Sequence, residues 1–191
     1  MVPPILQRVK ALGHRVFTSG DWNLNLVGIR SRPREANTFD DTFTCTYKEN
    51  RQWITRYWEC TTDPGTYWLE NPSRVEGTAI LVPGQYRNVY KIDKHRGKYD
   101  ALCQRNGQVK VYRDDNKDEI LDMDPEATVS GFFGINIHRA GKTGASAHVE
   151  RYSAGCQVLR DPRDFDMLMS IARKQIANRG WDTFTYTLIE D

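Results

Sequence analysis

The sequence lacks long apolar runs and any recognisable export signal. No stretch approaches the roughly 18 consecutive apolar residues of a membrane-spanning helix, so we expect no membrane insertion. The first residues, MVPPILQRVKALGHRV, contain neither the apolar segment nor the small-residue cleavage site of a signal peptide. These two absences predict a soluble chain in which nothing directs export.

The sequence also lacks an excess of either charge. Its 191 residues carry 27 basic and 25 acidic side chains, a formal net charge of +2. Because phosphate binding needs a concentrated basic face, this balance argues against nucleic acid as a partner. Hydrophobic residues make up 39% of the chain, which is typical of a globular protein with one real core. We therefore expect a single domain over residues 1–191.

Cysteine is scarce, and no pair of cysteines has the CxxC spacing of a metal or redox motif. Cys45, Cys60 and Cys103 fit the interpretation of small core residues, because free cysteine is among the most buried residue types. An even number of cysteines also permits two disulfides, although a domain of this size does not need them. Cys156 differs because it lies in a turn of small residues, Ser153-Ala154-Gly155-Cys156.

Alternating apolar and polar residues dominate the chain, which favours a mainly β fold. A short helix is predicted over 3–13, and a longer one begins at Asp161 and Pro162 and ends before Gly180. Strands are predicted over 21–30, 42–47, 52–61, 78–82, 89–92, 101–104, 108–112, 132–137 and 181–189.

The connecting segments have weaker signatures. A polar loop is predicted over 31–37 around Pro33, and 68–75 has no regular pattern. Residues 94–98 carry His95 among positive charges, which indicates a solvated loop. Asn106-Gly107 between two apolar runs predicts a β-hairpin.

Two stretches contain metal-ligand residue types, and neither is expected to bind a metal. The acidic stretch 114–124 lacks the glycine and terminal glutamate spacing of an EF-hand, which leaves a solvated loop. His138, His148 and Cys156 are zinc-ligand types, but their spacing matches no zinc pattern. No metal or other cofactor is therefore predicted.

The stretch 131–160 contains the residues best suited to chemistry. A cysteine attacks carbonyls as its thiolate and needs a base, for which histidine has the appropriate pKa. His138 follows a predicted strand and precedes Cys156 by 18 residues, a spacing that suits neighbouring strands joined by a loop. Small residues before Cys156 would let a substrate approach, and amides near Gly155 could face an oxyanion.

This stretch resembles the active-site motif of the L,D-transpeptidase (YkuD-like) family. In that motif a strand ends in Ile-His, and a loop of similar length leads to Ser/Thr-His-Gly-Cys. Here the residues are Ile137-His138 and then Ser153-Ala154-Gly155-Cys156. Ala154 replaces the second histidine, and Val158 stands where the family usually has Arg or Asn. The resemblance covers 39–191, after an N-terminal helix and strand in 1–38.

The resemblance implies a β-sandwich or barrel with one helix after the cysteine. Cys156 would be the nucleophile and His138 its base, oriented by the backbone carbonyl of Arg139. Ser153 would shape the turn, and Gly155 with Cys156 would form the oxyanion hole. Three further residues would bind substrate: Tyr86, His148 and Arg160.

The implied activity is cysteine-dependent hydrolysis or transfer on the stem peptides of peptidoglycan, through a thioester. Without an export signal, we expect a phage-type or effector-type enzyme that reaches the cell wall or periplasm by phage or secretion-system delivery, or as part of a virion with other virion proteins as partners. The alternative is a non-catalytic virion or envelope module that keeps the fold, which the changes at Ala154 and Val158 favour. A third reading is a thiol peptidase that cleaves ordinary L-peptides.

Overall fold

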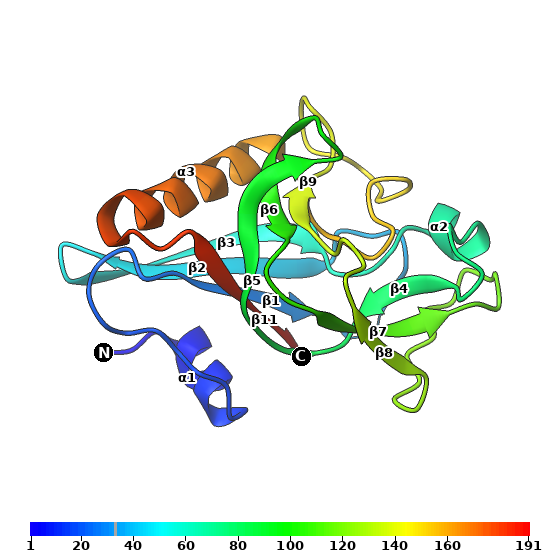
Figure 1. Ribbon diagram of the computed structural model, residues 1–191, viewed down its shortest axis with the longest axis horizontal. Coiled ribbons are helices and arrows are strands. Elements are labelled where there is room, and N and C mark those ends of the chain that lie inside the picture. Colours follow the sequence, from blue (N-terminus) through cyan, green and yellow to red (C-terminus); the bar gives the residue numbers. More distant parts are fainter. Residues whose placement is uncertain (33) are drawn as a thin grey trace.

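The fold is a closed β-barrel with a small three-stranded sheet at one end and a long helix along one side (Figure 1). The structure is a computed structural model that describes residues 1–32 and 34–191. The mainly β fold predicted from the sequence is confirmed. The predicted loop 31–37 includes Pro33, which lies outside the described residues.

Eight strands close the barrel in the order β1-β11-β5-β6-β9-β10-β3-β2. Most neighbours are antiparallel, but β1 pairs with β11, and β9 with β10, in parallel. The bounds of the strands are β1 Asn25–Arg30, β2 Asp41–Glu49, β3 Gln52–Thr61, β5 Gly84–His95, β6 Tyr99–Gln104, β9 Ile137–Arg139, β10 Gln157–Leu159 and β11 Thr183–Glu190.

Aromatic side chains fill the barrel interior. Phe43 stacks on Tyr186, with ring centroids 5.7 Å apart, and Tyr90 meets Tyr186 edge-on at 6.0 Å. The Tyr186 hydroxyl is buried and donates to Gln157 Oε1 at 2.7 Å. Because a buried hydroxyl needs a partner, this bond fixes the side chain that precedes Val158 on β10.

The small sheet has the order β4-β7-β8, with β4 Thr78–Leu81, β7 Val109–Asp114 and β8 Thr128–Gly131. The hairpin predicted at Asn106-Gly107 is therefore wrong, since β6 belongs to the barrel and β7 to this sheet. The amides of Arg105 and Asn106 instead donate to the Val89 carbonyl of β5. This segment crosses between the sheets and does not turn back on itself.

Two helices follow the sequence signals closely. The N-terminal helix α1 spans Pro4–Ala11 and buries one apolar face. The long helix α3 spans Pro162–Arg179, where the Asp161 side chain accepts from the Arg163 amide at 2.8 Å and Gly180 ends the helix at φ +70°. Among the described residues, no helix is long and apolar enough to cross a membrane.

Two predicted segments differ from the structure. The segment predicted to be irregular over 68–75 begins within a short helix, α2, Thr66–Glu70. The strand predicted over 132–137 is mostly extended loop, and β9 covers only Ile137–Arg139. His138 therefore lies inside a strand rather than after one, and its backbone is held in the barrel.

Candidate active site

Cys156 lies at one end of the barrel, directly before β10. It is partly buried, and its Sγ accepts from the Asn136 amide and donates to the Gly134 carbonyl, both at 3.4 Å. The side chain lines a cavity of about 300 Å³ together with His95 and Asn136. All four cysteines are free thiols and the other three are fully buried, so the alternative of two disulfides is wrong.

The turn before Cys156 is held by Ser153. Its buried Oγ donates to the Cys156 carbonyl at 2.8 Å and accepts from the Gly155 amide at 3.1 Å. Gly155 adopts φ +107°, and a Cβ there would overlap the Ala79 carbonyl oxygen, so only glycine fits. The turn-shaping position predicted for Ser153 matches these bonds. The expectation that Gly155 offers its amide to an oxyanion is corrected, because Ser153 occupies that amide.

His138 lies on β9 opposite Val158 of β10, two residues after Cys156. Its Nδ1 is 2.8 Å from the Arg139 carbonyl oxygen, which is the contact predicted for Arg139. The Tyr99 hydroxyl is 3.3 Å from the same nitrogen, and the Arg139 guanidinium covers the Tyr99 ring at 4.4 Å. The ring of His138 is therefore held along one edge by its own neighbour and by Tyr99.

These contacts determine the tautomer of His138. A carbonyl oxygen can only accept, so Nδ1 carries the hydrogen and Nε2 keeps a free electron pair. Nε2 is buried and has no hydrogen-bond partner among residues 1–32 and 34–191. Burial, reinforced by the nearby His95, lowers the pKa of His138 to about 3. The imidazole is thus a neutral base with its electron pair unused.

His95 is a site residue that the sequence did not reveal. It ends β5, is only 7% exposed and stacks on His138 with ring centroids 4.1 Å apart, so the predicted solvated loop at this position is wrong. Asn136 Oδ1 accepts from the Gln104 amide, which directs Nδ2 to His95 Nδ1 at 3.1 Å. His95 therefore carries its hydrogen on Nε2, the opposite tautomer to His138. The positive charges beside His95 in the sequence indicated a solvated loop and gave no sign of these contacts.

Cys156 directly precedes β10 and His138 lies on the paired strand β9, but no hydrogen bond joins their side chains. Burial raises the pKa of the Cys156 thiol, while the Asn136 amide and the charge of Arg96 oppose that shift. Because the pKa of the thiol is raised and that of the imidazole is lowered, both groups are neutral at rest. A resting thiolate–imidazolium pair does not fit these environments.

The three predicted substrate-binding residues lie outside the Cys156 cavity. The Tyr86 hydroxyl donates to backbone carbonyls of Val82 and Lys110, and burial raises its pKa. His148 is exposed on the loop between β9 and β10. Arg160 binds the Ser146 carbonyl at 2.9 Å and Glu59 at 2.9 Å, which anchors that loop to β3. The structure therefore does not bring these three residues together.

The described part of the chain holds no cluster of three or more His, Cys, Asp or Glu side chains that could bind a metal. In the acidic stretch 114–124, side chains bond to each other and to the backbone: Asn116 donates to Asp118 and Asp122, and the Asp122 amide donates to Asp114.

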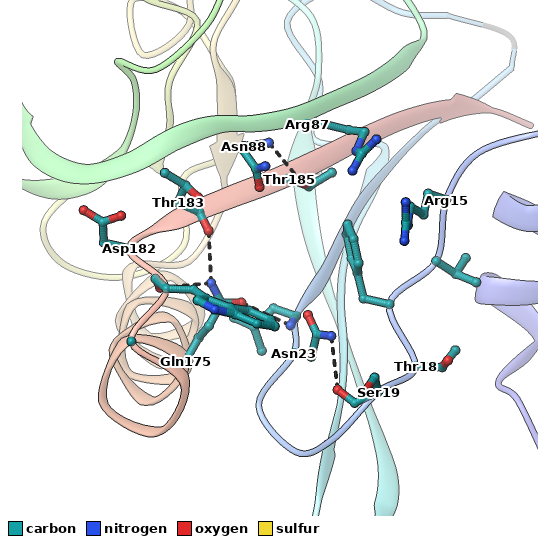
Figure 2. Close-up of a pocket in the computed structure, with 15 residues that line it drawn as sticks. Arg15, Thr18, Ser19, Asn23, Arg87, Asn88, Gln175, Asp182, Thr183 and Thr185 are labelled. Atoms are coloured by element: carbon teal, nitrogen blue, oxygen red, sulfur yellow. Dashed lines mark hydrogen bonds between the residues drawn. The ribbon is translucent and has the colours of Figure 1, made fainter.

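A second cavity, of about 630 Å³, lies between the start of β11, the end of α3 and the chain before β1 (Figure 2). Several of its polar side chains bond to backbone groups of other lining residues. Gln175 donates to the carbonyls of Trp181 and Thr183, and the Asn88 amide donates to Thr185 (Figure 2). The cavity contains neither a cysteine nor a histidine, so we do not assign the chemistry to it.

Comparison with known proteins identifies no relative of the chain, so a functional assignment depends on the geometry of the site. No protein-family model, no curated protein and no solved structure matches the chain.

Proposed function

We propose that this protein is a cysteine-dependent acyl-transfer enzyme in which Cys156 attacks a peptide carbonyl and His138 acts as its base. The observation that carries the proposal is the unpartnered Nε2 of His138, buried beside the chain that bears Cys156. Buried polar atoms are nearly always satisfied, and this exception lies behind His95, whose ring lines the Cys156 cavity.

The reaction begins from neutral groups. When substrate fills the cavity, the Cys156 thiol transfers its proton to His138 Nε2 and the sulfur attacks the carbonyl carbon. The tetrahedral intermediate collapses as the leaving amine takes the proton from Nε2, and a thioester remains on Sγ. Water then gives hydrolysis, and an amine gives transfer.

Separate groups stabilise the two charges that form during the reaction, the imidazolium and the oxyanion. The Arg139 carbonyl accepts from Nδ1–H at 2.8 Å and stabilises positive charge on the ring. The Cys156 amide is the remaining backbone donor of the predicted oxyanion hole, since the Gly155 amide is engaged. His95 Nε2–H is a second donor on the wall of the same cavity.

Peptidoglycan stem peptides are the substrate that we propose, on the basis of the motif around Ile137-His138 and Ser153 to Cys156. The test is digestion of purified peptidoglycan by the native chain and by Cys156→Ala, with product masses measured. Stem peptides that are cleaved or exchanged only by the native chain support the proposal, and the masses separate hydrolysis from transfer. Cleavage of ordinary L-peptides alone would replace this substrate with a general peptidase activity.

A non-catalytic binding module is the second candidate. The raised pKa of the Cys156 thiol favours it, because a binding protein has no need of an activated sulfur. Digestion that is absent with the native chain, across walls of several chemotypes, would support this candidate.

A further inference from the structure

The Cys156 cavity is lined by three arginines that come from separate segments of the chain. Arg74 lies before β4, Arg96 lies in the turn between β5 and β6, and Arg113 lies on β7. No acidic side chain is among the described residues that line this cavity. The wall around the thiol therefore has a single sign of charge.

These arginines have no ion-pair partner within the part of the chain described by the structure, whereas Arg30 and Arg160 do. Arg113 is partly buried and its guanidinium lies over the Phe133 ring at 4.7 Å. One of its terminal nitrogens donates to the Gly77 carbonyl at 3.1 Å, but its Nε is buried without a partner. A guanidinium prefers a planar, two-oxygen acceptor, and this one has a donor left over.

The electrostatic effects of the three charges overlap at the cavity. Burial lowers the pKa of Arg113, Arg74 lowers it further, and Glu76, which does not line the cavity, partly offsets both. Burial raises the pKa of Cys156 and lowers those of His95 and His138, and the charge of Arg96 opposes the first shift and adds to the other two. Like charges that converge on one cavity repel each other unless an anion is bound between them.

We propose that the Cys156 cavity binds an acyl donor that carries a free carboxylate close to the carbonyl that Cys156 attacks. This inference rests on the proposed function for its reaction, and it adds the charge of the substrate. The carboxylate would pair with Arg113 and receive further attraction from Arg74 and Arg96. Neutral donors of the same shape would leave the three positive charges of the cavity without a counter-ion.

The test uses alkylation of Cys156 by two reagents of similar size, the anion iodoacetate and the neutral iodoacetamide. Rates are followed by mass spectrometry of the Cys156 peptide, and their ratio is compared with that of free glutathione. An arginine-lined cavity should raise the iodoacetate to iodoacetamide ratio by roughly tenfold over the free thiol. Salt should reduce this preference.

The variants Arg113→Gln and Arg74→Gln should each lower the ratio several-fold, toward that of glutathione. Arg74 is exposed, so its replacement does not threaten the fold. Arg113→Lys keeps the charge and should preserve most of the preference, and Arg87→Gln, an exposed arginine in the second cavity, should leave the ratio unchanged.

A native ratio equal to that of glutathione, or a ratio that neither glutamine variant lowers, would overturn the inference. This result is independent of peptidoglycan digestion. Digestion that depends on Cys156 without an iodoacetate preference would reject the carboxylate and keep the proposed enzyme. A preference without digestion would keep the anion site and reject the proposed substrate.

Discussion

The Cys156 cavity and the cavity beside the start of β11 differ in the reactive groups that they hold. The larger one, about 630 Å³, has polar groups such as Gln175 and Thr185 that bond within the protein (Figure 2). The smaller one, about 300 Å³, has a free thiol, an orphaned Arg113 Nε and the orphaned His138 Nε2 behind its wall. Unpaired buried groups alone do not separate the two, since the Arg179 Nε behind Trp181 of the larger cavity is also unpaired within the described residues. The difference that indicates function is the thiol with an imidazole base behind it.

The strongest way to test this comparison is to remove the thiol. Cys156→Ala should lower the rate of peptidoglycan turnover by about 10³-fold or more, because no other group at the cavity can form a thioester. The measurement is the initial rate of product release. Turnover within a few-fold of native would place the chemistry elsewhere and remove the distinction between the cavities.

Replacement of the base should have the next largest effect. His138→Gln should lower the rate by about 10²- to 10⁴-fold, since the thiol then has no acceptor for its proton. His148→Gln is the matched control, because His148 is exposed on the connecting loop and should keep the native rate. Equal losses in both variants would contradict the role given to His138.

The turn that carries Cys156 should tolerate no side chain at Gly155. In Gly155→Ala the added Cβ would overlap the Ala79 carbonyl oxygen, and the φ of +107° is unfavourable for alanine. This substitution should lower the free energy of unfolding by about 3 kcal/mol or more. Gly144→Ala is the control, because its φ of +70° has open space around it and should cost about 1 kcal/mol. Denaturant unfolding measures both, and similar losses would show that the close approach is not required.

The neutral state of His138 predicts a pH dependence of stability. Its pKa is about 3 in the folded protein and 6.5 when unperturbed, so the unfolded chain binds the proton first as pH falls. The stability that this histidine supplies is complete above pH 6.5 and decreases toward pH 3, by roughly 2 kcal/mol at about pH 5.

Unfolding free energies at several pH values should therefore fall more steeply for the native chain than for His138→Gln. Other groups contribute in both senses, since burial lowers the pKa of His95 to about 4 and raises that of Asp63 to about 6, but these groups are common to both chains. His148→Gln should keep the native slope. Parallel curves for native and His138→Gln would mean that His138 is not neutral in the fold.

The smallest effect is expected in the larger cavity. Trp181 is 47% exposed on its wall and packs against Arg179 at 4.1 Å. Trp181→Ala should change stability by no more than about 1 kcal/mol and leave turnover within a few-fold of native. A large loss of turnover at native stability would give the second cavity a part in the reaction.

Local signals in the sequence predicted local structure well. Asp161, Pro162 and Gly180 set the ends of α3 because each acts on the adjacent backbone. Strand pairing was harder, since Asn106-Gly107 has the chemistry of a hairpin turn but is bound to Val89 of β5. Which strands pair is decided by contacts distant in sequence, and no turn motif contains that information.

The site residues also divide into those that the local sequence predicted and those that it did not. His138, the Arg139 carbonyl and Ser153 could be named because they lie near Cys156 in one recognisable stretch. His95 and Arg113 could not, since β5 and β7 reach the cavity only through the register of two different sheets. A charged neighbourhood also made His95 look solvated, although its ring is covered by His138.

The most direct test of the central claim is detection of the covalent intermediate. The native chain is mixed with purified peptidoglycan fragments, quenched in acid and mapped by mass spectrometry. We predict an acyl adduct on the peptide that contains Cys156, which is absent in Cys156→Ala and strongly reduced in His138→Gln. Turnover of the fragments with no adduct on Cys156, and with undiminished rate in Cys156→Ala, would contradict the claim.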